Sequence, residues 1–243
     1  MSSRRLFGVA LVSLLGFSVG TAHAAVIYSG VDIGGGVSGP RTNSDAAHAT
    51  WAAAAGPSDA LEDFEAIALG SSSPLSLSGG ITLSTLGTIA SGNLNIVASD
   101  GDPQIGYNTT AGGTNFFRLA PEFGGVATMT LTFDDPVLAF GVYITGVQSG
   151  FGGTVVYIGA DSFNLPDTQG APGLAGVQFF GFTSAVPIGS ISFVTTANPG
   201  VGRDIMGFDD LELVRATAPA PPVGVLLLVG LAAAAARGRR FVR

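Results

Sequence analysis

The chain has 243 residues, enough for one sizeable domain with a buried core, and it contains neither cysteine nor lysine. All seventeen Asp and Glu residues fall between Asp32 and Glu212, whereas six of the ten arginines lie outside residues 25–216. With four arginines against seventeen acids, residues 25–216 carry a formal charge of −13. This excludes nucleic acid as a partner, since binding phosphates requires Lys and Arg, and it leaves cations and neutral sugars.

Residues 1–24 have the layout of a secretory signal peptide. Arg4 and Arg5 form a positive region, and an apolar region runs from Leu6 to Val19. Ala22 and Ala24 are the small residues of a cleavage site, and we predict the cut after Ala24. We therefore expect export, with the export machinery and signal peptidase as partners. The exported chain must be stable without disulfides.

Residues 25–60 are expected to hold a strand, Val26–Asp32, and one short surface helix. Gly34–Gly39 matches a dinucleotide-binding fingerprint, but Pro40 follows where a helix should begin, so a flexible turn is predicted. An alanine-rich run, Ser44–Ala55, begins with two candidate N-cap residues and predicts the helix. His48 lies in this run without a visible catalytic partner, and we expect it to have a packing or surface role.

Residues 61–215 are predicted to form an all-β, antiparallel, jelly-roll-like β-sandwich. Ala127, Met129, Leu131 and Phe133 alternate with threonines, the period of a strand with one buried face. Many short strands without long amphipathic helices favour a sandwich over a parallel sheet. The other predicted strands are Leu61–Ile67, Ile81–Thr85, Leu94–Ala98, Asn115–Leu119, Val137–Val147, Thr154–Ile158, Val177–Phe182, Ile188–Thr195 and Ile205–Val214. Residues 134–136, Asp-Asp-Pro, are predicted to form a turn.

Two acidic clusters carry the candidate chemistry. First and last strands are often neighbours in jelly rolls, so Glu65 and Asp210 are expected to meet at one edge of the sheet. Glu65, Asp209 and Asp210 would then form a structural calcium site, because calcium takes carboxylate and carbonyl oxygens; no other cofactor is required. Solvated loop acids are the alternative.

The same acids, together with the pairs Asp100 and Asp102 and Asp134 and Asp135 between them in the chain, raise the hypothesis of a glycosidase. Such an enzyme needs two carboxylates about 5 to 9.5 Å apart across a cleft. Because neighbouring strand residues point to opposite faces, Asp209 and Asp210 can share a cleft only if a bulge lies between them. Sugar stacking would need exposed aromatic rings at the cleft. Trp51, the only tryptophan, lies in the sequence outside the strand-rich body.

Residues 216–243 form a separate tail. An apolar run of fourteen residues, Val223–Ala236, lies between prolines and arginines. As a helix it would be about 21 Å long, shorter than the roughly 30 Å of a hydrocarbon core, so this hydrophobic helix is expected to enter the inner membrane only transiently. The positive-inside rule places the arginines in the cytoplasm. The flanking residues are Pro219, Pro221, Pro222, Arg237, Arg239 and Arg240.

The order of proline cluster, apolar run and terminal arginines, in a chain with a signal peptide, resembles the PEP-CTERM sorting tail of Gram-negative exopolysaccharide producers. That family usually has Pro-Glu-Pro, where this chain has Pro-Ala-Pro-Pro at 219–222. The resemblance implies processing by an exosortase-like enzyme. The precursor would be inserted in the inner membrane, and the product would lie at the cell surface or outside the cell.

Short pieces of the body, FDDPVLAFGVYITG, QFFGF, IGSISFV and GFDDLEL, resemble the β-sandwich domains that commonly precede such tails. Those domains are similar to galactose-binding-like and carbohydrate-binding jelly rolls, and no catalytic residue comes with the resemblance. The favoured hypothesis is a non-catalytic exported protein of the surface or extracellular matrix, associated with exopolysaccharide or biofilm. The alternatives are a secreted polysaccharide hydrolase with an Asp/Glu pair and an adhesive layer protein.

Overall fold

The computed structural model describes residues 25–99, 101–171 and 173–216. The residues predicted for signal cleavage and sorting lie outside the described residues, so both signals stay predictions; these residues are Ala22, Ala24, Pro219, Pro221, Pro222, Arg237, Arg239 and Arg240. Within the described part of the chain, no helix has the length and apolar character needed to cross a membrane.

The elements of the described residues follow in chain order, with η marking a short 3-10 helix. They are β1 (Val26–Asp32), α1 (Thr42–Ala55), β2 (Ala60–Glu62), β3 (Leu75–Leu77), η1 (Ser78–Gly80), β4 (Ile81–Gly87), β5 (Ile89–Ala98), η2 (Pro103–Ile105), β6 (Asn115–Pro121), β7 (Val126–Thr145), β8 (Thr154–Ile158), β9 (Asp161–Asn164), β10 (Val177–Thr196) and β11 (Met206–Arg215).

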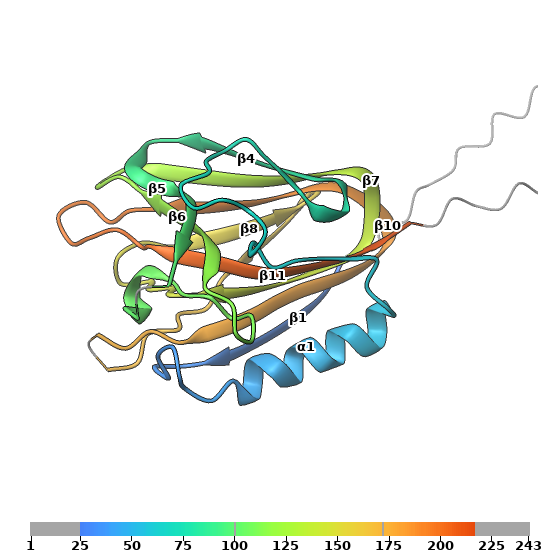
Figure 1. Cartoon of the computed structure of the whole chain (residues 1–243), viewed down its shortest axis with the longest axis horizontal. Helices are drawn as coiled ribbons and strands as arrows, with labels where there is room; N and C mark the ends of the chain where they lie inside the picture. Colours follow the sequence, from blue (N-terminus) through green and yellow to red (C-terminus); the bar gives the residue numbers. More distant parts are fainter. Residues whose placement is uncertain (1–24, 100, 172, 217–243) are drawn as a thin grey trace, which may run out of the picture.

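The strands form an antiparallel sandwich of two layers, because β7 and β10 are long enough to take part in both (Figure 1). Both strands bend near their middle, and their register shifts between residues 183 and 190 of β10. One layer has the order β3-β4-β7-β10-β8-β9. The other has the order β1-β10-β7-β11. At the start of β11, β6 pairs with β11 and β5 pairs with β6, and toward the end of β11 it pairs with β2. The predicted all-β, jelly-roll-like sandwich is confirmed.

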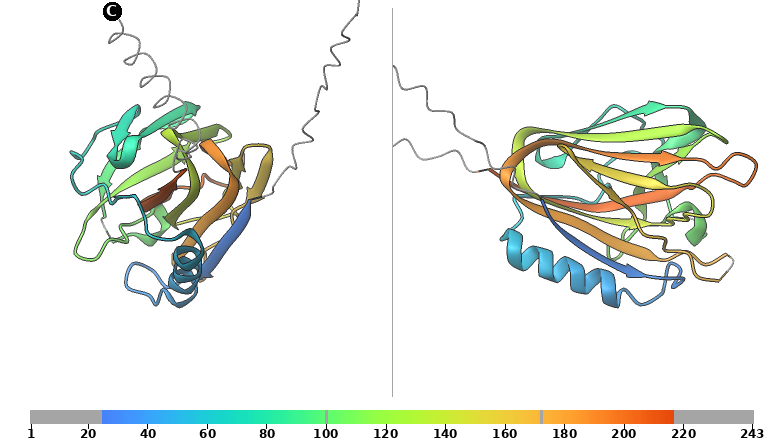
Figure 2. Two further views of the ribbon diagram at one scale, coloured as in Figure 1. Left: turned by 90° about the vertical axis from the view of Figure 1, so that its right-hand side faces the viewer. Right: turned by 180° about the vertical axis from the view of Figure 1, so that it is seen from behind.

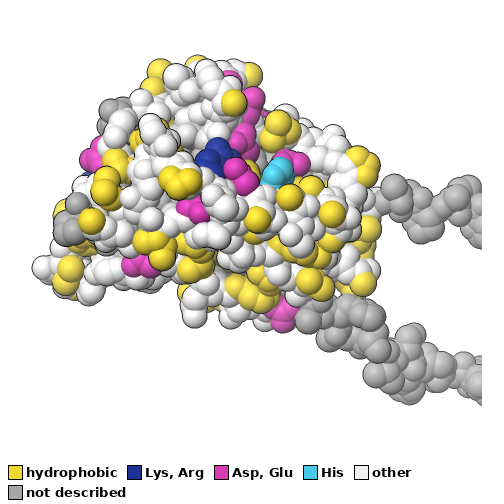
Figure 3. Space-filling view, turned by 90° about the horizontal axis from the view of Figure 1, so that it is seen from below, with side chains coloured by type: hydrophobic (Ala, Val, Ile, Leu, Met, Phe, Trp, Pro, Cys, Tyr) yellow, Lys and Arg dark blue, Asp and Glu magenta, His cyan; other side chains and the backbone are white. Residues whose placement is uncertain are grey.

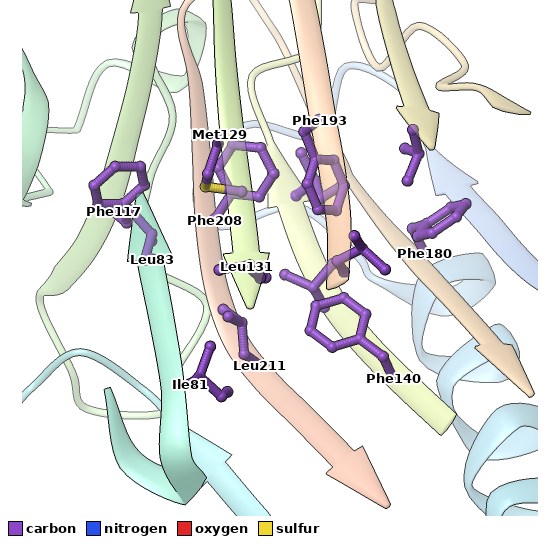
Figure 4. Packing of buried hydrophobic residues seen from close by; sticks show 14 of the residues in the cluster. Ile81, Leu83, Phe117, Met129, Leu131, Phe140, Phe180, Phe193, Phe208 and Leu211 are labelled. Atoms are coloured by element: carbon purple, nitrogen blue, oxygen red, sulfur yellow. The ribbon is translucent and has the colours of Figure 1, made fainter. Parts of the chain in front are cut away.

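The hydrophobic core fills the space between the two layers (Figure 4). In the first half of β7, Met129 and Leu131 are buried while Thr130 between them is partly exposed, as the alternating pattern predicts. Aromatic rings meet across the layers: the ring centroids of Phe193 on β10 and Phe208 on β11 lie 5.0 Å apart, edge to face. Because the chain has no cysteine, burial of these side chains is the main stabilising contribution.

Helix α1 packs on the outer face of the second layer (Figure 2). Trp51 is fully buried there, its Nε1 donates to the carbonyl of Phe182, and its ring centroid lies 5.7 Å from that of Phe179. Gly141 on β7 and Gly181 on β10 pair directly, and a Cβ on either would come within 2.8 Å of the Phe179 ring. The expectation that Trp51 lies outside the strand-rich body was therefore wrong, because the helix that carries it covers the sheet.

The start of α1 depends on a residue of β1. The helix begins at Thr42 without a side-chain N-cap of its own, so the caps predicted within the run were wrong. Instead, the carboxylate of Asp32 accepts the backbone N–H of Asn43 at 3.0 Å and that of Ser44 at 2.8 Å, and also the Ser44 hydroxyl at 2.7 Å. A negative charge here also suits the positive end of the helix dipole.

Several strand boundaries differ from the prediction. The strand expected over 61–67 ends at Glu62, because Phe64 adopts a φ of 59° and its ring is buried in the core. The pairs of strands expected over 127–147 and 177–195 are the single bent strands β7 and β10, so residues 134–136 form a bend within β7 and not a turn. Strands β3 and β9, with three and four residues, are too short to show a period in the sequence. The turn predicted at Gly34–Gly39 is confirmed as a loop.

Both ends of the described chain lie where β7 and β10 bend, which we call the bend end (Figure 2). Val26 pairs with Thr183 beside the bend of β10, and the N–H of Ala216 donates to the carbonyl of Pro136 in the bend of β7 at 3.0 Å. At the opposite end, which we call the loop end, β7 and β10 begin and finish. The loops there are thus turned away from both chain ends.

Candidate functional site

Asp209 and Asp210 reach the same loop although they are neighbours on β11. The register between β11 and β7 shifts between Asp209 and Glu212, and Asp210 has a φ of 48°. This bulge brings both carboxylates to the Thr109 hydroxyl, whose Oγ1 lies 3.1 Å from Oδ2 of Asp209 and 2.8 Å from Oδ2 of Asp210. The bulge that the sequence argument required for a shared side is therefore present.

The acidic residues hold the loop 108–115 from two sides. Asp209 Oδ2 accepts the backbone N–H groups of Thr109 at 2.5 Å and Thr110 at 3.1 Å. Glu65 Oε1 accepts three hydrogen bonds at 2.7 to 2.8 Å, from Asn108 Nδ2 and from the N–H groups of Thr114 and Asn115. The strand before Glu65 does pair with β11, as expected. The structure connects Glu65 to the two aspartates through this loop.

A metal site at these residues would need free carboxylate oxygens. In the described residues, no group of three or more His, Cys, Asp or Glu side chains is placed to hold a metal ion. Glu65 Oε1 and Asp209 Oδ2 already accept N–H donors, which cannot be metal ligands themselves. Asp209 Oδ1, by contrast, is buried without a hydrogen-bond partner among the described residues, so calcium binding by Glu65, Asp209 and Asp210 stays a prediction.

Burial gives Asp209 an unusual protonation equilibrium. The side chain is fully buried, and burial raises its pKa to about 7; the charge of Asp210 acts in the same direction, against the N–H groups of Thr109 and Thr110. A carboxyl group with such a pKa has the acidity of a general acid. At 0% exposure, however, Asp209 has no contact with solvent and hence none with a polysaccharide. The pair does not form the open cleft of a glycosidase.

A charged cluster lies beside this loop on the face that carries α1, where Figure 3 shows arginine, acidic and histidine side chains close together. The Arg41 guanidinium lies 4.3 Å from the Tyr143 ring centroid and 3.3 Å from Asp45, which also accepts the Tyr143 hydroxyl at 2.8 Å. One turn further along the helix, His48 Nε2 lies 2.7 Å from Glu212 Oε1. The His48 ring also packs on Trp51 and Phe179, so the packing role predicted for His48 is confirmed.

A first pocket, of about 270 Å³, opens at the loop end between this cluster and the glycine-rich loop after β1; we call it the helix-side pocket. Hydroxyl, amide and guanidinium groups dominate its lining. Its lining includes Val37, Arg41, Ser99, Tyr107, Asn108 and Thr110. The Ser99 hydroxyl is buried and has no hydrogen-bond partner within the described part of the chain. The pocket therefore offers polar groups to a neutral, hydroxyl-bearing ligand.

A second pocket, of about 340 Å³, lies among the loops of the same end; we call it the loop-end pocket. Phe123, in the turn between β6 and β7, lines this pocket and is 71% exposed. The Arg203 guanidinium lies 5.2 Å from the centroid of the Phe123 ring. Gln104, Gln148 and Asp102 also line the pocket. An exposed aromatic ring with convergent polar side chains is the composition of a ligand site.

Sequence reasoning missed the residues of both pockets. Phe123 stands in the segment Pro-Glu-Phe-Gly-Gly, where the glycines predict a turn and nothing predicts an exposed ring. Arg203 belongs to a loop whose nearest predicted strand begins at Ile205. The one available signal was compositional, because Arg41, Arg118, Arg203 and Arg215 are the only basic residues of the body and two of them line pockets.

No protein-family model matches the chain, and no curated protein sequence matches it. Solved structures similar to it include the K1 cleaved adhesin domain of Lys-gingipain from Porphyromonas gingivalis W83, with 10% identity and a TM-score of 0.40 over 67% of this chain and 100% of that domain. TmCBM61 in complex with β-1,4-galactotriose is 14% identical, with a TM-score of 0.38 over 64% of this chain and 95% of that one. The catalytic domain of a GH87 α-1,3-glucanase is 13% identical, with a TM-score of 0.33; 67% of this chain matches only 29% of that chain. These scores assign the chain to no family.

Proposed function

We propose that the protein is an exported, non-catalytic β-sandwich module that binds a neutral polysaccharide, with the exopolysaccharide of the producing cell as its candidate ligand. The observation that carries the proposal is the loop-end pocket with its exposed Phe123 ring. An aromatic face packs against the C–H groups of a sugar ring, while amide and carboxylate groups bind its hydroxyls. Gln104 and Asp102 line the same pocket, and we expect their side chains to bind those hydroxyls.

Charge narrows the class of polysaccharide. Residues 25–216 have a formal charge of −13, from four arginines and seventeen acids, so an anionic polysaccharide would be repelled over most of the surface. Arg41 of the helix-side pocket lies 3.3 Å from Asp45, and Arg203 and Asp102 both line the loop-end pocket. A neutral sugar suits such balanced linings.

Export and sorting complete the proposal. The predicted signal peptide and the PEP-CTERM-like tail support secretion, a transient inner-membrane stage read by an exosortase-like enzyme, and release to the cell surface or matrix. Residues 25 and 216 both lie at the bend end, so a tail attached there leaves the loop end free to meet polysaccharide. Mass spectrometry of the protein from the producing cell tests this part. A form that keeps both predicted signals in the cytoplasm would overturn it.

The second candidate, a hydrolase, has less support. Of its candidate carboxylates, Asp209 is fully buried, and both Asp209 and Asp210 bind Thr109. An assay for reducing ends released from the producer's polysaccharide separates the two candidates. Release that is lost in Asp210→Asn would favour the hydrolase.

Binding is tested by affinity electrophoresis of the full-length protein in gels that contain the producer's exopolysaccharide, dextran or galactan. We expect retardation by at least one neutral polysaccharide, and loss of about 1–2 kcal/mol of binding free energy in Phe123→Ala. Tyr157→Ala is the matched control, because Tyr157 is an exposed aromatic residue on β8 that lines neither pocket. Equal retardation of both variants and the wild type, or none at all, would overturn the proposed function.

A further inference from the structure

We propose that the helix-side pocket is a second sugar subsite, so that one polysaccharide chain occupies both pockets across the segment 102–110. This inference rests on the proposed function, and it adds a second contact region and a requirement for ligand length. Four observations carry it: the shared wall of the pockets, their closeness, the lining of the helix-side pocket and its charge balance.

The two pockets share one stretch of backbone as their common wall. Asp102, Gln104 and Ile105 line the loop-end pocket, and Tyr107 and Thr110 line the helix-side pocket. Ile105 and Tyr107 are two residues apart, so their Cα atoms are separated by about 7 Å at most. Neighbouring residues of one segment therefore line the two pockets.

A second contact places them together independently. Gly36 lines the helix-side pocket, and a Cβ built on it would lie 3.9 Å from Cγ of Pro103, the first residue of η2. The same short helix continues through Gln104 and Ile105 into the loop-end pocket. An extended ligand that leaves one pocket across η2 thus enters the other.

The wall itself is held rigidly. Asp102 accepts the N–H of Gln104 at 2.9 Å at the start of η2, and the Thr145 hydroxyl bonds both the N–H and the carbonyl of Tyr107, at 2.8 and 2.9 Å. Further along, Asp209 holds Thr109 and Thr110. A preformed wall keeps the two subsites at a fixed spacing, which lowers the entropic cost of binding both at once.

The helix-side pocket has an unused polar group. The Ser99 hydroxyl is buried without a partner among the residues that the structure describes, and such groups are normally satisfied. Ser99 lines the pocket, so we expect a rotation of its side chain to bring this hydroxyl to a sugar hydroxyl. Arg41 cannot make the pocket an anion site, because Asp45 and Asp210 already balance its charge. The lining selects for a neutral ligand, as in the loop-end pocket.

The experiment uses the producer's exopolysaccharide, hydrolysed to oligosaccharides that are sized by chromatography, and isothermal titration calorimetry of the full-length protein. We expect the affinity to rise more than tenfold with oligosaccharide length until both pockets are filled, and then to level off. Val37→Arg places a long side chain at the helix-side pocket, and Val37 is 42% exposed, so the fold should accept it. The variant should bind long oligosaccharides only as tightly as short ones.

Two further variants control for charge and folding. Val186→Arg makes the same change at a 47% exposed valine in the bend of β10 and should bind as the wild type does. Ser99→Ala removes the unpartnered hydroxyl without adding bulk and should weaken only the long oligosaccharides. If Val37→Arg and Ser99→Ala keep the full length dependence while Phe123→Ala loses binding, the second subsite is overturned and the proposed function stands. If the wild type binds no oligosaccharide, the proposed function itself fails.

Discussion

His48 on α1 and Glu212 on β11 join the helix to the last strand, with 2.7 Å between Nε2 and Oε1. The hydrogen bond to Glu212 raises the pKa of His48 above 6.5, against burial, and the charges of Asp45 and Asp210 act with Glu212. Because the folded pKa is raised, the protonated pair stabilises the fold fully below about pH 6.5. That contribution is lost as the pH rises through the pKa of the folded state.

We therefore expect the melting temperature of Glu212→Gln to fall less than that of the wild type between about pH 6 and pH 8. The comparison must be made between variants, because burial also raises the pKa values of Asp204 and Asp209 to about 7, with the same sign. Glu122→Gln changes the same charge on the exposed β6–β7 turn and serves as control. Parallel pH profiles for Glu212→Gln and the wild type would contradict the prediction.

Asp32 and α1 give a second prediction, this time on the acid side. Burial would raise the pKa of Asp32, but the hydrogen bonds from Asn43 and Ser44 hold it below 3.8. Because the pKa of Asp32 is lower in the folded state, its ionised carboxylate stabilises the fold at pH values above the pKa of the unfolded state. That stabilisation is lost as the pH falls through the pKa of the folded state. Asp32→Ala should cost about 1–2 kcal/mol at neutral pH, the value of an N-cap.

Chemical denaturation followed by the fluorescence of Trp51, the only tryptophan of the chain, measures this cost. Asp161→Asn is a suitable control, because Asp161 lies on β9 in the layer that α1 does not cover. An unchanged denaturation midpoint for Asp32→Ala would mean that the start of α1 does not depend on β1.

The strands could be predicted from the sequence where the pattern is local. Met129 and Leu131 alternate with threonines, and the inward and outward faces follow from that alternation alone. The cap from Asp32, the bulge at Asp210 and the contact between His48 and Glu212 could not be predicted in this way. Each depends on how segments pair in space: Thr109 and Asp209, for example, are 100 residues apart in the chain.

The candidate site shows the same division. The sequence singled out Glu65, Asp209 and Asp210 as acids of one edge, and the structure does link them, through hydrogen bonds to the loop 108–115. It could not show which carboxylates would be buried, because the burial of Asp209 depends on the loop 108–115, which lies against β11. Phe123 was missed for the opposite reason, since an aromatic residue in a turn is usually expected to pack inward.

Gly141 and Gly181 provide a third prediction, about the fit between α1 and the sheet. A Cβ on Gly181 would lie 2.8 Å from Cδ1 of Trp51 and 2.8 Å from the Phe179 ring. Gly181→Ala should therefore destabilise the protein by about 1–3 kcal/mol through overpacking. Gly189→Ala on the same strand is the matched control, because its Cβ would meet nothing within 4 Å.

Combining the change with Trp51→Ala sharpens this test. Removing the indole frees space beside Gly181, so the cost of Gly181→Ala should be smaller in the Trp51→Ala background, which denaturation followed by circular dichroism can measure. Strictly additive costs would show that the glycine is not there to make room for the tryptophan.

The loop 108–115 gives the last prediction, which also tests the calcium hypothesis. Since Glu65 and Asp209 already accept N–H groups of this loop, we expect a chelator to leave the melting temperature unchanged. Thr110→Val removes the 2.7 Å hydrogen bond from the Thr110 hydroxyl to Asp210, which should lower the free energy of unfolding by about 1 kcal/mol. The melting temperature of this variant should therefore be lower than that of the wild type, with or without chelator. A melting temperature that falls with chelator and recovers with Ca²⁺ but not Mg²⁺ would instead support a metal at Glu65, Asp209 and Asp210, because calcium would then be binding to the folded state.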